Sequence, residues 1–125
     1  MAPGFERQRA AKGPTVKGFA GGGFNVDDRT YRALLLTPER ATEWDAPPLA
    51  ELAPVHVESV LGLSPPPEFL ILGTGPSLAF PPRDFVRALE ERGIGVEAMD
   101  SRAAARTWGL LRSEERWIAA AIMGL

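Results

Sequence analysis

The sequence predicts an α/β fold, because strand-like and helix-like stretches alternate along the second half of the chain. Residues 69–72 form a short unbroken apolar run, which is typical of a strand buried on both faces. Apolar residues then recur at helical spacing over 82–92, and a second strand-like run follows at 96–99. Helical spacing of apolar residues returns from Ser101, and the last apolar run is 117–123. Strands alternating with helices of this length favour right-handed crossovers, so we expect a parallel β-α-β-α-β unit.

Both expected helices have an apolar face and recognisable ends. Pro82 suits the first turn of the first helix, and Gly93 suits its left-handed end. Asp100 or Ser101 can accept hydrogen bonds from the first amides of the second helix. The residues that define the apolar faces are Phe85, Val86 and Leu89 in the first helix and Ala104, Trp108 and Leu111 in the second.

The first half of the domain is predicted to be an antiparallel β meander with short connections, which extends or covers the parallel sheet in one layered mixed structure. Three consecutive glycines at 21–23 predict a hairpin loop or bulge, although glycines can also let a backbone approach a ligand. The expected strands are 16–19, 24–26, 31–36 and 41–44, with turns at 27–28 and 37–40.

The segments around the meander are expected to be less regular. Residues 1–14 are small, polar and basic, which predicts a disordered tail or an ordered partner-binding arm before a single domain at 15–125. Residues 45–54 contain three prolines and should be irregular or a single helical turn, and 56–63 are the next helix. Three prolines at 65–67 then predict a stiff connector, or less simply a polyproline ligand.

Composition limits the possible functions. The chain of 125 residues is 45% hydrophobic, which is enough for one domain with a hydrophobic core that needs no disulfide or metal for stability. The absence of cysteine removes thiol chemistry, and a net charge of −2 without a basic cluster argues against nucleic-acid binding. No apolar run reaches the roughly 20 residues of a membrane helix, and no secretory signal is apparent. We therefore expect a cytoplasmic protein with at most peripheral membrane association.

No catalytic set emerges from the residue types. His56 is the only histidine, which leaves no histidine pair for a metal. The adjacent carboxylates at 27–28 and 114–115 are interpreted as solvated charges rather than as an acid/base pair. The three tryptophans, Trp44, Trp108 and Trp117, are interpreted as core or half-core anchors. We expect neither enzymatic activity nor a cofactor or metal.

A glycine loop follows the first parallel strand, where open parallel sheets bind ligands. Its residues are Gly73, Thr74, Gly75, Pro76 and Ser77. The opening resembles a dinucleotide loop, but Leu78 replaces the third glycine, Pro76 lacks an amide donor, and several residues precede the helix. We favour a tight turn over a nucleotide site.

Arg102 and Arg106 share one face at the start of the second helix, where positive charge opposes the helix dipole. This placement predicts a compensating partner. The candidates are an internal carboxylate such as Glu97 or Asp100, an acidic patch on another protein, and a small anion near the glycine loop. The internal ion pair is the default expectation.

Five stretches carry a further signal: 24–27 with Tyr31, 68–75, 93–99, 103–108 and 114–121. Taken together they resemble the Mth938-like domain family, which includes the mitochondrial complex I assembly factor 3. The resemblance implies one compact α/β domain, no established activity or cofactor, and protein partners in the assembly of the respiratory NADH dehydrogenase at the inner membrane. Relatives often have Cys-Arg-Thr-Tyr-Asn where this chain has Ala105 to Gly109, so thiol or amide chemistry at that place is not expected here.

The sequence therefore predicts a non-enzymatic protein-binding module that assists assembly of a membrane-associated complex, at the cytoplasmic face of the membrane. The alternative is a small-anion or nucleotide-binding domain that uses the glycine loop and Arg106, and self-association is a third possibility. The residues expected to form the binding surface are Gly73, Thr74, Gly75, Ser77, Arg102 and Arg106.

Overall fold

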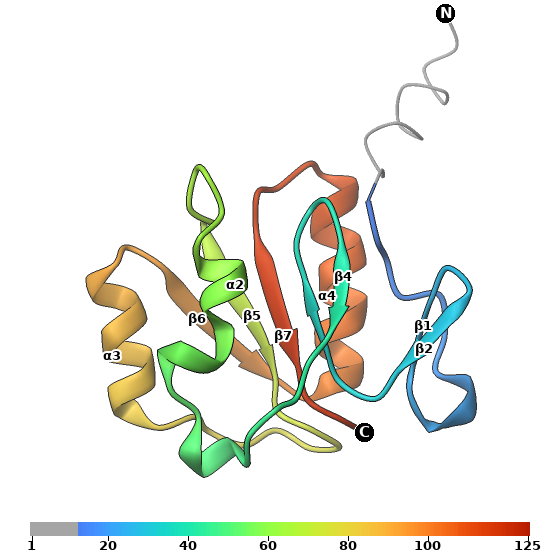
Figure 1. Cartoon of the computed structure of the whole chain (residues 1–125), viewed down its shortest axis with the longest axis horizontal. Helices are drawn as coiled ribbons and strands as arrows, with labels where there is room; N and C mark the ends of the chain where they lie inside the picture. The colour runs from blue at the N-terminus through green and yellow to red at the C-terminus, as the bar shows by residue number, and fades with distance from the viewer. Residues whose placement is uncertain (1–12) are drawn as a thin grey trace, which may run out of the picture.

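The computed structural model describes residues 13–125 and contains a five-stranded mixed sheet (Figure 1). Its strands are β3 (Leu34–Leu36), β4 (Ala41–Glu43), β5 (Phe69–Gly73), β6 (Gly95–Met99) and β7 (Ala119–Ile122). They lie in the order β4-β3-β7-β5-β6, in which β7, β5 and β6 are parallel and β3 is antiparallel to both of its neighbours. The predicted parallel unit and mixed sheet are confirmed.

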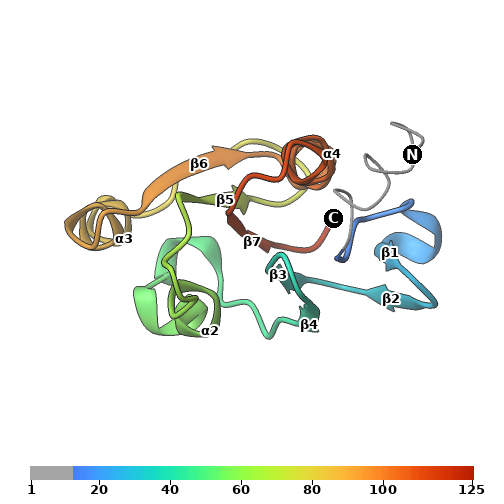
Figure 2. The ribbon, with the colours of Figure 1, turned by 90° about the horizontal axis from the view of Figure 1, so that it is seen from above.

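Helices and a small second sheet cover the two faces of the sheet (Figure 2). Helix α4 (Ser101–Ser113) and the hairpin of β1 (Phe24–Val26) and β2 (Arg29–Tyr31) pack on one face. The other face carries α3 (Arg83–Glu91), α2 (Glu58–Leu61) and the 3-10 turn η3 (Pro54–Val57). Along β3, β5 and β7, successive apolar side chains point alternately into the two cores, so both faces of these strands are apolar.

The local sequence signals in the second half of the chain match the structure. The Asp100 carboxylate accepts a hydrogen bond from the Ala103 amide at 3.1 Å and so caps α4. Gly93 has the left-handed φ of +80° expected at the end of α3, whereas Pro82 is the residue before its first turn. Trp108 and Trp44 are buried and Trp117 is half-buried, as predicted for core anchors.

The predicted continuous strand at 31–36 is wrong, because strand β2 ends at Tyr31 and strand β3 begins at Leu34. These two residues belong to different sheets, β2 and β3. Their side chains nevertheless enter the same core, beneath α4. Residues three apart cannot share one face of a continuous strand, where the side-chain period is two, so the strand must be interrupted. The first half is therefore two separate antiparallel hairpins rather than one meander.

The predicted strand at 16–19 is also wrong, since only an isolated bridge joins Gly18 to Asn25. The glycines that follow form a 3-10 turn, η1 (Ala20–Gly22), in which Gly21 and Gly22 have φ near +77° and +76°. The Asn25 side chain accepts a 2.8 Å hydrogen bond from the Ala20 amide and thereby closes this turn. The glycines are needed for the backbone conformation of the turn.

The region before β5 is more broken than the helix predicted at 56–63. It contains η3 and the short α2, and it is preceded by the 3-10 turn η2 (Leu49–Glu51), which agrees with a single helical turn at 45–54. The predicted tail lies outside the described residues except for positions 13 and 14. Pro14 is buried, and its carbonyl accepts a 2.8 Å hydrogen bond from the Trp108 indole.

Candidate functional site

The glycine loop lies at the edge where the three parallel strands end, and hydrogen bonds tie it to both neighbouring strands. The Thr74 amide donates to the Met99 carbonyl at 2.9 Å, just as β6 ends. The Met123 amide donates to the Gly73 carbonyl at 3.0 Å, just after β7 ends. The loop therefore has a fixed position relative to all three strands.

Ser101 is the buried centre of this edge, with no exposed surface. Its hydroxyl donates to the Met123 carbonyl at 2.7 Å and accepts from the Gly75 amide at 2.8 Å. Its own amide donates to the Gly75 carbonyl at 2.8 Å. Sequence reasoning identified Ser101 only as a possible cap. The available signal was a hydroxyl directly after a strand end, level with a glycine loop.

Thr74 and the two glycines serve the shape of the loop. The Thr74 hydroxyl donates to the Ser77 carbonyl at 2.8 Å and accepts from the Ala79 amide at 3.1 Å. A Cβ on Gly73 would lie 2.8 Å from the Ser101 hydroxyl oxygen, and Gly75 has a φ of +111° that favours glycine.

The hydrogen bonds within the glycine loop occupy the backbone amides that would otherwise be free to bind an anion. The amides of Thr74 and Gly75 donate within the protein, and Pro76 has none. The first turn of α4 already holds the Asp100 carboxylate. A phosphate loop presents free amides at a helix N-terminus. The geometry thus fits a tight turn, and it lends no support to the small-anion or nucleotide alternative.

Arg102 and Arg106 are exposed on α4. The Arg102 guanidinium lies over the Phe19 ring, 5.6 Å from its centre, and turns toward the N-terminal segment. Within residues 13–125, neither arginine forms an ion pair, so the default expectation of a bond to Glu97 or Asp100 is wrong for this part of the chain. For Arg102 the structure shows a different partner, the face of the Phe19 ring.

The structure thus divides the predicted surface into two parts. Gly73, Thr74 and Gly75 are buried and act as support, whereas the exposed members are Ser77, Arg102 and Arg106. Only the exposed members have side chains that another molecule can reach.

An exposed apolar loop directly after the glycine loop was missed by sequence reasoning. Leu78 is 55% exposed and Phe80 is 83% exposed. Phe80 also borders a shallow groove of about 400 Å³ over the outer face of α3. The available signal was a pair of large apolar residues inside a proline-rich stretch, outside any helical or strand period.

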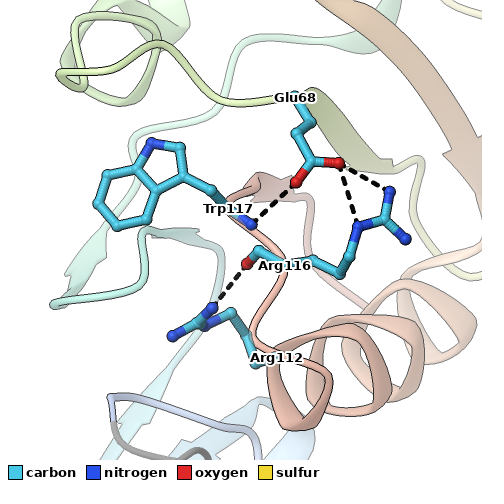
Figure 3. A network of polar contacts seen from close by, with 4 residues as sticks. All are labelled: Glu68, Arg112, Arg116 and Trp117. Atoms are coloured by element: carbon cyan, nitrogen blue, oxygen red, sulfur yellow. Dashed lines mark hydrogen bonds and ion pairs between the residues drawn. The ribbon is translucent and has the colours of Figure 1, made fainter.

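A polar network at the opposite end of the parallel strands joins the residue before β5 to the residues that lead into β7 (Figure 3). Arg116 donates two hydrogen bonds to one carboxylate oxygen of Glu68, at 2.8 and 3.1 Å, and the Trp117 amide donates to the other at 3.2 Å. The Arg116 guanidinium, followed by the Trp117 amide, lowers the pKa of Glu68. Glu68 in turn raises the pKa of Arg116. These bonds fix the α4-to-β7 connection.

Two features are absent from residues 13–125. That part of the chain has no group of three histidine, aspartate or glutamate side chains arranged to hold a metal. It also has no helix with the length and apolar character needed to cross a membrane.

Sequence comparison places most of the chain among known relatives. A family model described as "Protein of unknown function (DUF498/DUF598)" matches residues 16–123. The zebrafish protein named NADH dehydrogenase [ubiquinone] 1 alpha subcomplex assembly factor 3 is 27% identical over 94% of this chain, and its bovine counterpart is 26% identical over 86%. The chain spans 68% of the zebrafish protein and 59% of the bovine one.

Two solved bacterial structures illustrate the likeness in fold. A crystal structure of a Bordetella parapertussis protein is 32% identical with a TM-score of 0.80, covering 90% of this chain and 96% of the other. A Bordetella pertussis protein described as a Mth938-like domain is 25% identical with a TM-score of 0.76, covering 92% and 87%. The Mth938-like fold expected from the sequence is therefore confirmed.

Proposed function

Because the chain belongs to the DUF498/DUF598 family, we propose that it is a non-enzymatic protein-binding module that assists assembly of a membrane-associated respiratory complex. The observation that carries the proposal is the similarity, over 94% of this chain, to a protein named as an assembly factor of NADH dehydrogenase. The proposed partners are subunits or assembly factors of that complex. The proposed location, the cytoplasm at the inner face of the membrane, follows from these partners.

The exposed arginines of α4 are proposed to be part of the recognition surface. Arg106 stands one helical turn beyond Arg102, which is stacked on Phe19, and both are accessible. Arginine is frequent at protein interfaces because its planar group binds carboxylates through two parallel hydrogen bonds. The expected contact is therefore an acidic patch on the partner. The buried glycine loop supports this surface by holding the start of α4 through Ser101.

The test is an affinity capture from native cell extract that includes detergent-solubilised membranes. Wild type is compared with Arg106→Ala and with Arg40→Ala, a matched change of an exposed arginine in the β3–β4 turn. We expect wild type and Arg40→Ala to retain NADH dehydrogenase subunits or assembly factors, and Arg106→Ala to lose them while keeping its circular dichroism spectrum. Retention of no such protein by the wild type would refute the proposed function. Equal retention by a folded Arg106→Ala would refute the role of the arginine.

A further inference from the structure

We propose that the 78–82 loop and the outer face of α3 form a docking groove for a protein segment that presents a large apolar side chain beside carboxylates. We refer to this surface as the α3 groove. It is lined by Phe80, Pro81, Arg83, Val86, Arg87 and Glu90. The inference rests on the proposed protein-binding function and specifies the chemistry of one contact, at a place distinct from Arg102 and Arg106.

The first argument is the concentration of exposed apolar surface. Within residues 13–125, the large hydrophobic side chains that are mostly exposed are Val55, Leu78, Phe80 and Leu110. Two of these four lie within three residues of each other, and Phe80 is the most exposed of the set at 83%. Large aromatic side chains are costly to leave in water, and those that enter a partner's pocket contribute most to binding.

The second argument is that the loop is already held in shape. The Thr74 hydroxyl binds both the Ser77 carbonyl and the Ala79 amide, so the base of the loop is fixed from within. Pro81 and Pro82 restrict the backbone between Phe80 and α3. A rigid loop loses little conformational freedom when a partner covers it, which favours binding.

The third argument is the charge of the groove. Arg83, Arg87 and Glu90 lie at i, i+4 and i+7 along one face of α3, with Val86 between them. Within the described chain Arg83 has no ion pair, and Arg87 has only a 3.9 Å contact with the 97% exposed side chain of Asp84. The groove therefore presents two weakly compensated guanidinium groups beside Phe80, and it matches an acidic, apolar segment.

A lipid surface fits these observations less well. The groove is concave and of a size to receive a side chain, whereas an anionic bilayer responds to the summed charge of a surface. Helix α3 as a whole carries two arginines against Asp84, Glu90 and Glu91, so its net charge is negative. An extended anionic bilayer would meet this net negative charge, whereas a segment seated in the groove meets only its lining, in which Arg83 and Arg87 outnumber Glu90.

The test is a titration of the full ¹⁵N-labelled chain, followed by NMR, with synthetic twelve-residue peptides. One peptide has a central leucine and phenylalanine flanked by glutamates, and its counterpart has lysines in place of the glutamates. We expect saturable shifts confined to the amides around residues 78–90, with the glutamate peptide binding at least about fivefold more tightly, as two exposed ion pairs predict. No shifts at millimolar peptide, or equal affinity for both peptides, would overturn the proposal.

Matched variants identify the residues responsible. Phe80→Ser should weaken the glutamate peptide by about tenfold or more, because a buried aromatic contact is lost. Val55→Ser, a change of a 72% exposed apolar residue elsewhere, should leave the affinity unchanged. The double change Arg83→Glu with Arg87→Glu should reverse the preference toward the lysine peptide. Undiminished binding by a folded Phe80→Ser, or an unreversed preference, would contradict the α3 groove.

Two other occupants give different results. Phe80-dependent sedimentation with phosphatidylcholine and phosphatidylglycerol vesicles, without peptide binding, would assign the loop to a lipid surface and overturn the proposal. Phe80-dependent dimerisation in analytical ultracentrifugation, without peptide binding, would assign it to a second copy. Failure of the groove is separable from failure of the function. Capture of complex subunits by both wild type and Phe80→Ser would support the proposed function and refute the α3 groove. Peptide binding in the groove without capture of complex subunits would support the α3 groove and refute the proposed function.

Discussion

The Ser101 hydroxyl donates a 2.7 Å hydrogen bond to the Met123 carbonyl, across 22 residues of sequence. The same oxygen accepts from the Gly75 amide. One buried atom therefore joins the start of α4 to the ends of β5 and β7. Because no water reaches it, each of its two partners depends on it for a hydrogen bond.

Ser101→Ala should lower the free energy of unfolding by about 1–3 kcal/mol, since it leaves a buried carbonyl and a buried amide without partners. Urea unfolding followed by tryptophan fluorescence measures the change. Ser113→Ala is the control in the same helix, because the Ser113 hydroxyl is exposed and binds only its own helix backbone. Equal losses for the two variants would mean that the buried Ser101 hydroxyl stabilises the fold no more than the exposed Ser113 hydroxyl does.

Gly73→Ala should destabilise the fold by about 1–3 kcal/mol through overpacking. The added carbon would lie 2.8 Å from the Ser101 oxygen and 2.9 Å from a methyl carbon of Ile122. Gly109→Ala is the opposite case, because a Cβ inside α4 meets nothing within 4 Å there. That change should raise stability by up to about 1 kcal/mol. Thermal unfolding measures the stability of both variants against the wild type. A Gly73→Ala variant that is more stable than the wild type would contradict the packing argument.

Trp108→Phe should lower the free energy of unfolding by about 1–3 kcal/mol, because the carbonyl of buried Pro14 loses the indole donor that binds it. The amide of Lys17, which donates to the Asn25 carbonyl in the same segment, should exchange faster with deuterium. Trp117→Phe is the comparison, since the indole of Trp117 donates to the Pro65 carbonyl where water has access. A larger loss for Trp117→Phe than for Trp108→Phe would disprove this account.

Glu68→Gln should reduce stability near neutral pH and have little effect in acid. The folded state lowers the pKa of Glu68, so the unfolded chain binds more protons and stability rises with pH through this window. The contribution is complete above the usual glutamate pKa of about 4.3 and is lost as the pH falls through the lower folded value. Denaturant titrations from pH 7 to pH 3 measure the difference between wild type and variant.

Glu91→Gln serves as the control for the pH experiment, because Glu91 is exposed and makes no ion pair in the described part of the chain. Its stability should follow the wild type at every pH. A constant difference between wild type and Glu68→Gln across the whole range would show that the Glu68 charge is not what matters.

The second half of the fold could be predicted from sequence because its signals are local. The apolar run at β5, the cap at Asp100 and the glycine after α3 each act within a few residues. The break between Tyr31 and Leu34 could not be predicted in this way. Both residues do lie in strands, and the interruption follows from the shared core beneath α4, which forms only in three dimensions.

The candidate site was less predictable for a similar reason. The glycine loop was placed correctly, but its amides are used by Ser101 and Met99, which lie about 25 residues further along the chain. The missing ion pair of Arg102 depends on where Phe19 arrives. Phe80 is exposed whereas Phe85, the next phenylalanine, is buried, and no local pattern around Phe80 reveals this difference.

The central place of β7 has a consequence for the order of folding. Strand β7 lies between β3 and β5, so the β3–β4 hairpin and the β5–β6 pair are joined in the five-stranded sheet only through it. Residues 119–122 are synthesised after all the other strands, so the five-stranded sheet can form only once β7 has been made. Until then the apolar edges of β3 and β5 are open to mispairing, which makes the nascent chain a candidate for chaperone binding.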